Sequence, residues 1–298
     1  MDTVNSLATE PSVTIMTQLA YTVIDSADNS LHKTSTLITG ETEAIVVDAA
    51  FTRADGHRIA AEVLDSGKRL TTVVVTAGDP DFYFGAEVVA DAFPDAVFVA
   101  PVDVIEHIQH SYEGKLKAWA HLGPNLPTRL VDIEPLTDSV LTVDGTSIEV
   151  RRGSDRLGDR AWYLFEPMSG SLVGGVLLFE GLHVWTADSA TPELRTEWIR
   201  VLDQLEALAP TFVVAGHRTA GSPTDLTAIA HTRDYLGLFE KTVTDAADAA
   251  EAEATLLAAY PDAGLQIATL VPKMNRPMTA TSATTPSTVP ARPVQKPA

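Results

Sequence analysis

The sequence predicts an α/β layered fold. Short runs of Val, Ile and Thr, typical of buried strands, alternate with segments whose apolar residues recur at helical spacing. The clearest passage places strands at 44–47, 70–76 and 96–100 and helices at 53–66, 84–92 and 102–119. Two successive strand–helix–strand passes favour parallel pairing of these strands.

The flanking segments complete the predicted pattern. Residues 18–24 and 34–38 are predicted strands, rich in β-branched residues, with a turn at Gly40-Glu41. The middle of the chain is β-rich, with short strands predicted at 137–143, 147–151, 162–165, 171–178 and 182–185. An amphipathic helix at 191–208, a buried strand at 211–215 and a largely helical, Ala-rich stretch at 224–259 follow.

Composition and charge exclude several classes of function. The 298 residues are 45% hydrophobic and 20% charged, which is ordinary for a globular protein. The formal net charge of −19 disfavours binding to nucleic acid or to an anionic membrane, because both carry negative charge. With no cysteine, the chain has no disulfide, thiolate zinc site or cysteine nucleophile.

The two ends of the chain carry separate expectations. The first residues lack the basic start and apolar core of a signal peptide, and no stretch approaches the roughly 18–20 apolar residues of a membrane helix. We therefore expect a cytoplasmic protein. Residues 273–298 are rich in Pro, Thr, Ser and Ala, cannot bury enough apolar surface to offset the ordering entropy, and are predicted to be a disordered tail.

The first candidate for chemistry is the segment 76–85, which follows a buried strand and precedes a helix. Loops at the carboxyl ends of strands are where sites form in α/β sheets. Asp79 and Asp81 stand two residues apart beside a Pro, so they can bind a cation or act as a general base. The alternative is structural: one carboxylate caps the following helix and the other is solvated.

Two histidines follow apolar runs in the same way. His217 comes directly after the strand at 211–215 and Gly216, a position suited to metal ligation or proton transfer. His183 lies in the segment 181–188, where an extended chain would put it on one face with Trp185. Both can instead be structural, and Asp188, just before a helix, can be a capping carboxylate.

Together these pieces resemble the metallo-β-lactamase fold superfamily over about residues 15–220. The segments 34–38, 44–49 and 73–76 resemble its opening strands and the strand before its metal motif. The resemblance implies a four-layer αβ/βα sandwich of two mixed sheets flanked by helices. It also implies a single domain over 1–272, with the site in the cleft at one edge of the sheets.

The family's metal motif, Thr-His-x-His-x-Asp-His, is degraded in this chain. Its three His positions hold Ala77, Asp79 and Phe82, and only Asp81 matches among the ligands. No His occurs near Arg151 or Arg152, where the next ligand is expected, and Gly174-Gly175 stands where the bridging Asp should be. A less favoured register puts Asp188 there. The family's last His matches His217.

The resemblance implies three alternative functions. The first is a hydrolase acting on a small ester, lactone or amide through at most one metal ion, Zn, Fe or Mn, held by Asp79, Asp81 and His217 with His183 as a possible fourth ligand. The second is a metal-independent lyase, isomerase or cyclase, with Arg152 holding an anionic group. The third is a ligand-binding pseudoenzyme. The sequence names no substrate beyond a small molecule and carries no signal for oligomeric state.

Overall fold

The computed structural model describes residues 18–273, which contain two mixed β-sheets. The first sheet has the strand order β1 (Ala20–Asp25), β2 (Thr34–Thr39), β3 (Glu43–Val47), β4 (Arg69–Val74), β5 (Val97–Ala100) and β6 (Glu134–Pro135). The strands β1 to β3 pair antiparallel, and β3 to β6 pair parallel. The parallel pairing predicted from the strand–helix–strand passes is therefore confirmed.

The second sheet comes from the middle of the chain. Its order is β12 (Phe212–Val213), β10 (Ser171–Val173), β9 (Trp162–Glu166), β8 (Thr146–Arg152) and β7 (Val140–Val143). The β10–β12 pair is parallel and the other pairs are antiparallel. A separate parallel pair joins β11 (Phe179–Glu180) to β13 (His217–Arg218), which carries one of the candidate histidines.

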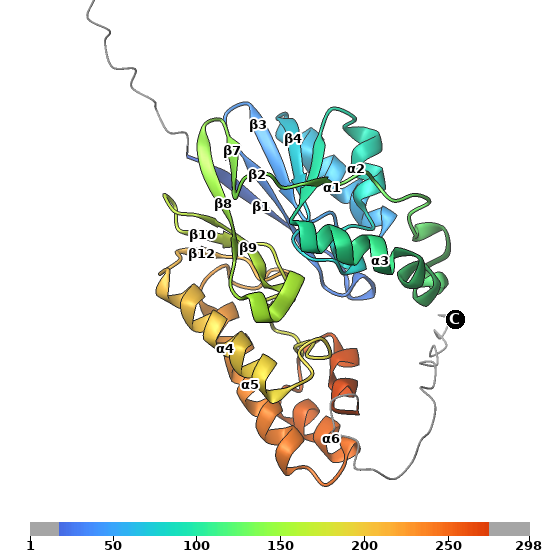
Figure 1. Cartoon of the computed structure of the whole chain (residues 1–298), viewed down its shortest axis with the longest axis vertical. Helices are drawn as coiled ribbons and strands as arrows, with labels where there is room; N and C mark the ends of the chain where they lie inside the picture. Colours follow the sequence, from blue (N-terminus) through green and yellow to red (C-terminus); the bar gives the residue numbers. More distant parts are fainter. Residues whose placement is uncertain (1–17, 274–298) are drawn as a thin grey trace, which may run out of the picture.

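Helices cover the outer faces of the two sheets (Figure 1). They are α1 (Arg53–Ser66), α2 (Ala86–Ala92), α3 (Val102–Ala118), α4 (Pro192–Ala207), α5 (Thr227–Asp245) and α6 (Ala249–Ala259). Short 3₁₀ segments are η1 (Asp28–Ser30), η2 (Pro80–Phe82), η3 (Ala120–Asn125), η4 (Asp155–Ala161) and η5 (Gln266–Lys273). In Figure 1 the helices α1 to α3 lie with the first sheet, and α4 and α5 lie side by side against the second.

Three buried apolar clusters define the layers. One lies between the sheets and joins Ile45 and Val74 of the first to Val150 and Leu164 of the second. A second packs α1 and α2 on the other face of the first sheet. The third, and largest, packs α4, including Trp198, against the outer face of the second sheet. This helix–sheet–sheet–helix order is the predicted sandwich, because each amphipathic element buries one face.

Some predicted elements are shorter or absent. The strand predicted at 171–178 ends at Val173, because Gly174 and Gly175 both have φ near +78° and leave the sheet. The strand predicted at 182–185 is absent, and β11 forms just before it. The helical stretch at 224–259 is broken at 246–248 between α5 and α6. The predicted tail at 273–298 lies outside the described residues, apart from its first residue at the end of η5.

No helix within residues 18–273 combines the length and apolar character needed to cross a membrane.

One buried carboxylate fixes the loop that carries Asp79 and Asp81. Asp48 follows β3, and its Oδ1 accepts hydrogen bonds from the backbone N–H of Thr76 at 2.9 Å and from the Thr76 hydroxyl at 2.7 Å. The same hydroxyl oxygen accepts from the N–H of Gly175 at 2.8 Å. Both sheets are thus tied to the first residue of this loop, so the loop has a defined starting point.

Candidate active site

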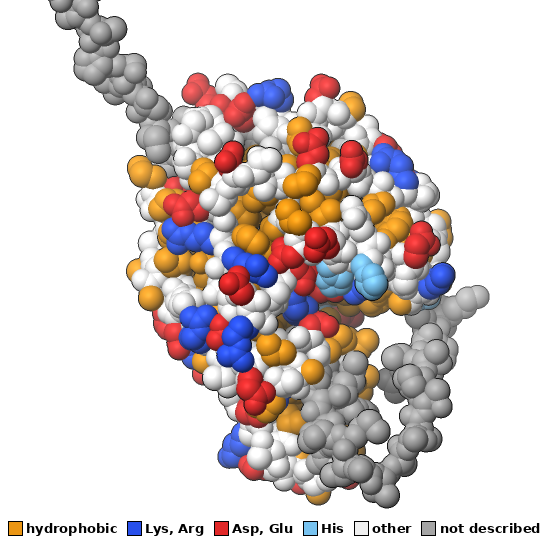
Figure 2. All heavy atoms as spheres, in the orientation of Figure 1, with side chains coloured by type: hydrophobic (Ala, Val, Ile, Leu, Met, Phe, Trp, Pro, Cys, Tyr) orange, Lys and Arg blue, Asp and Glu red, His pale blue; other side chains and the backbone are white. Residues whose placement is uncertain are grey.

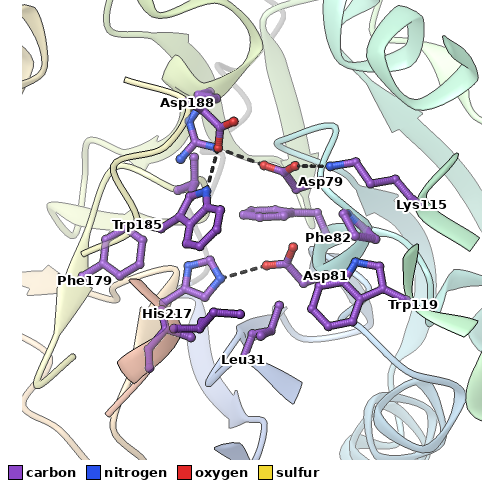
Figure 3. Close-up of a pocket in the computed structure, with 15 residues that line it drawn as sticks. Leu31, Asp79, Asp81, Phe82, Lys115, Trp119, Phe179, Trp185, Asp188 and His217 are labelled. Atoms are coloured by element: carbon purple, nitrogen blue, oxygen red, sulfur yellow. Dashed lines mark hydrogen bonds and ion pairs between the residues drawn. The ribbon is translucent and has the colours of Figure 1, made fainter. Parts of the chain in front are cut away.

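The candidate site is a cavity of about 170 Å³ at the edge of the sandwich (Figure 3). The loop after β4 supplies Asp79 to Phe82, the end of α3 supplies Lys115 and Trp119, and β13 supplies His217. The remaining lining residues are Leu31, Arg160, Val176, Phe179, Trp185, Asp188, Leu265 and Ile267. Most of the wall is therefore aromatic or aliphatic, with a few charged groups, as is usual for a small-molecule site.

Asp81 and His217 form a buried pair at one side of this cavity. Their side chains are 7% and 6% exposed, and His217 Nε2 lies 2.8 Å from Asp81 Oδ2. An ionised carboxylate can only accept hydrogen bonds, so Nε2 of His217 carries the proton. Nδ1 is then unprotonated and has a lone pair. Nδ1 is buried and has no hydrogen-bond partner among the described residues.

The surroundings of His217 keep its imidazole neutral. Burial lowers the pKa of His217, and the hydrogen bond that the imidazole donates to Asp81 opposes this without reversing it. The positive charges of Lys33 and Arg160 lower it further. The ring also stacks on Phe179, with the ring centres 5.0 Å apart and the planes 9° from parallel. The result is an oriented, neutral base, which is the state needed to accept a proton near pH 7.

Four charged side chains form a row across the cavity from this pair, and Asp188, Asp79 and Lys115 are labelled in Figure 3. Lys115 Nζ donates to Asp79 Oδ1 at 2.9 Å, and Arg160 Nη1 donates to Asp79 Oδ2 at 3.0 Å. The same Nη1 donates to Asp188 Oδ2 at 2.8 Å, which also accepts from the indole N–H of Trp185 at 2.8 Å. Carboxylates and cations thus alternate along the row.

The row fixes the ionisation of Asp79. Burial by itself would raise the pKa of this carboxyl group, but Arg160 and Lys115 outweigh burial, and the pKa lies below its ordinary value. Asp79 does not cap the short segment that follows it, because no side-chain cap bond is formed there. Its carboxylate is committed to the two cations, so it is an ion-pair partner rather than a free base.

A third cation lies behind the cavity wall. Lys33 is fully buried, and its Nζ donates to Asp48 Oδ2 at 3.0 Å and to the carbonyl oxygen of Thr34 at 2.6 Å. The ammonium group also lies 4.1 Å from the centre of the Phe82 ring, in cation–π contact. Phe82 occupies a His position of the family's metal motif, so a buried organic cation lies directly behind a lost ligand position.

The residues present do not fit a divalent metal ion. Asp79, Asp81 and His217 line one cavity, but both oxygens of Asp79 are bonded to cations and Asp81 is bonded to His217. An incoming metal ion would have to displace these partners and approach Lys115 and Arg160 against their charge. Within residues 18–273, no group of three or more His, Asp or Glu side chains is arranged to hold a metal.

Two of the predicted site residues lie elsewhere. His183 is fully buried, with Nδ1 3.2 Å from the Tyr235 hydroxyl of α5, and does not line the cavity. The segment is not a strand, and Trp185 lines the cavity whereas His183 does not. Arg152 pairs with Asp103 at 2.9 Å and Asp155 at 3.2 Å beside a different cavity, so it is not near the Asp81–His217 pair.

No pattern in the sequence singles out Lys115 or Arg160. Neither belongs to a motif, and each is brought to Asp79 from a distant element, α3 for Lys115 and η4 for Arg160. One feature of the sequence does point to a cationic partner. Asp79 places a carboxylate where the family has a neutral His ligand, and a buried carboxylate requires a cationic or hydrogen-bonding partner. The pattern does not tell which of the 21 Lys and Arg residues supplies it.

A second histidine–carboxylate pair holds the elements that carry Lys115 and Arg160. His107 Nδ1 of α3 lies 2.6 Å from Asp159 Oδ2 of η4, which also accepts from the Gly78 N–H at 3.2 Å. In Figure 2, pale-blue imidazoles lie beside red carboxylates on the surface over α3. The hydrogen bond that His107 donates to Asp159 raises the pKa of His107, and burial opposes the rise.

The raised pKa predicts a pH-dependent contribution to stability. The pair contributes fully below the ordinary His pKa of 6.5, and the contribution is lost as the pH rises through the elevated folded-state pKa. The urea midpoint of the wild-type protein should therefore be higher than that of a His107→Gln variant. The difference between the two midpoints should be largest near pH 6 and smaller near pH 8.5. A margin that stays constant or grows with pH would contradict this assignment.

Comparisons with known proteins agree with the fold and the order of elements. The metallo-β-lactamase superfamily model matches residues 30–217. No curated protein matches significantly. Among solved structures, a metallo-β-lactamase family protein from Thermus thermophilus is 18% identical, with a TM-score of 0.61, covering 86% of this chain and 91% of that one.

Two further structures are similar at the same low identity. A β-lactamase domain protein from Burkholderia ambifaria is 16% identical with a TM-score of 0.59, covering 86% of this chain and 84% of its own. A metallo-β-lactamase from Pontibacter korlensis is 16% identical with a TM-score of 0.53, covering 76% and 97%. At this identity the structures show the fold alone, whereas the family model matches more than half of the chain. The chain belongs to the metallo-β-lactamase superfamily.

Proposed function

We propose that the chain is a metal-independent enzyme that moves a proton on a small organic substrate, in a lyase or isomerase type of reaction. The observation that carries the proposal is the buried Asp81–His217 pair, with a neutral imidazole whose Nδ1 has no partner among the described residues. A carboxylate that fixes the tautomer and leaves the other ring nitrogen free is the arrangement of a general base.

In the proposed step, the Asp81–His217 pair in the cavity wall accepts a proton from a carbon next to a carbonyl group. The C–H electron pair moves into the carbonyl system and gives an enolate, and the imidazolium that forms is stabilised by Asp81. The same proton, or one exchanged with water, then returns to the enolate at the same or another atom. Each proton removed is returned, so the step needs no co-reactant.

Hydrolysis by a metal-activated water receives less support from this donor set, because Asp79 and Asp81 are occupied by Lys115, Arg160 and His217. The charged row also argues for a working site rather than a decayed one. Three ion pairs hold Asp79 and Asp188 in place beside the cavity.

The direct test is hydrogen–deuterium exchange of small carbonyl compounds in D₂O, followed by proton NMR. A proton-transfer enzyme exchanges an acidic C–H even when the final product is unknown. We expect exchange that persists in the presence of a chelator. Exchange that stops with the chelator and returns with added metal would favour a metalloenzyme. Tight ligand binding with no exchange would favour a non-catalytic binding protein.

A further inference from the structure

We infer that the cavity takes a neutral, planar, ring-sized molecule that carries a hydrogen-bond acceptor such as a carbonyl oxygen. The inference deepens the proton-transfer function proposed above and rests on it for the identity of the reacting site. Size, wall chemistry, charge and free donors each limit the ligand independently.

Size sets the first limit. The cavity has a volume of about 170 Å³. An apolar protein cavity of roughly 150 Å³ can hold one benzene molecule, so this one accommodates a single ring with a small substituent. A bicyclic or long-chain ligand would have to extend beyond the mouth, where Ile267 is 44% exposed.

The walls set the shape. Trp185 and Trp119 lie on opposite sides of the cavity, with the Phe82 ring between them (Figure 3). Leu31 and Val176 add aliphatic surface. Aromatic walls favour a planar ring, because stacked and edge-to-face contacts add to the gain from apolar burial.

The formal charges of the lining exclude an anionic ligand. The cations Lys115 and Arg160 face three carboxylates, Asp79, Asp81 and Asp188, and His217 is neutral. The lining therefore carries a formal charge of −1, and both cations are already bonded to Asp79. An anion would be repelled by the excess carboxylate, and it would meet cations whose charge is already offset by Asp79.

A cationic ligand is disfavoured for a different reason. It would lie within the same small space as Lys115 and Arg160, and it would lose its hydration in a largely apolar cavity. It also offers no acceptor. Lys115 Nζ has three protons and one partner among the described residues, Asp79 Oδ1, so it can donate to an acceptor on the ligand. A carbonyl oxygen supplies that acceptor without adding charge.

The test is a binding panel with matched probes: benzamide, benzoate, benzylamine and cyclohexanecarboxamide. The first three share one ring and differ in charge, and the fourth keeps the amide and loses planarity. Binding is followed on the indole N–H signals in nitrogen–proton NMR spectra. We expect benzamide to bind at least about tenfold more tightly than the other three. We also expect it to shift the signals of Trp119 and Trp185 and not that of Trp162.

A matched pair of variants locates the binding. Trp119→Leu should weaken benzamide binding, whereas Trp162→Leu, at a half-buried Trp that lines another cavity, should not. Tighter binding of benzoate or benzylamine, equal binding of the non-planar amide, or no binding of benzamide would overturn the inference. None of these results bears on the proton position of His217, so failure here is distinguishable from failure of the proposed function.

Discussion

Replacing Lys33 by Met should lower the free energy of unfolding by about 3–5 kcal/mol, the range for a buried ion pair that loses one partner. Lys33 and Asp48 are both fully buried, 3.0 Å apart, so the variant leaves the Asp48 carboxylate without its cation. It also removes the ammonium group from the Phe82 ring. Urea unfolding at neutral pH measures the effect as a lower midpoint at an unchanged slope.

The matched control is the double variant Lys33→Met, Asp48→Asn. An Asn side chain keeps an acceptor for Thr76 and removes the buried charge, so most of the lost stability should return. A single variant that costs less than about 1 kcal/mol, or a double variant no more stable than the single one, would show that the pair does not hold this wall of the cavity.

The second large effect concerns activity. Asp81→Asn should lower the rate of solvent exchange by about 10²- to 10⁴-fold, the range ascribed to a positioned general base. An Asn can donate to Nε2 and so favours the wrong imidazole tautomer, with the proton on Nδ1. His217→Gln should give a loss at least as large. The nitrogen-15 shifts of His217 report the cause, because Nδ1 should be unprotonated in the wild-type protein and protonated in Asp81→Asn.

The matched control is Asp103→Asn. Asp103 also lines a cavity and accepts a hydrogen bond from the Trp162 indole at 3.0 Å, but that cavity is a different one and His217 does not line it. We expect its exchange rate to stay within about twofold of wild type. Equal losses in the two Asn variants, or a protonated Nδ1 in the wild-type protein at neutral pH, would contradict the role given to Asp81.

Local patterns predicted the helices well. The helix expected at 53–66 has those bounds in the structure. Thr52 caps its first turn in a capping box with Asp55, and Gly67 ends it with φ of +65°. These signals are contained within a few residues of sequence, and they need no knowledge of the rest of the fold.

Strand prediction failed where backbone geometry decided the outcome. The apolar run 171–178 looked continuous, but a side chain at Gly175 would collide with the Trp162 carbonyl oxygen, and the chain turns away there. Val176 lines the cavity, and the Leu177 carbonyl oxygen accepts a hydrogen bond from the Trp198 indole of α4, so these residues are buried outside the sheet. Apolar runs show that a segment is buried, and they do not show whether it is paired.

The site was predicted in part for the same reason. Asp79, Asp81 and His217 follow strands, so their meeting at one sheet edge could be anticipated. Lys115 and Arg160 reach that edge from helical segments, and their roles depend on tertiary contacts that no local pattern encodes. Arg152 was predicted to hold an anionic group because it lies near a position where the family has a metal ligand. In the structure it forms an ion pair with Asp103 instead.

If the Asp81–His217 pair acts without a metal ion, the protein should not retain one, and reconstitution followed by metal analysis measures this. The untagged protein is incubated with zinc, manganese and iron(II), freed of unbound ions and analysed by mass spectrometry, beside a His217→Gln, Asp81→Asn double variant. We expect no near-stoichiometric metal in either protein and the same solvent exchange before and after treatment. One bound metal ion per chain in the wild-type protein, lost in the double variant, would contradict the account.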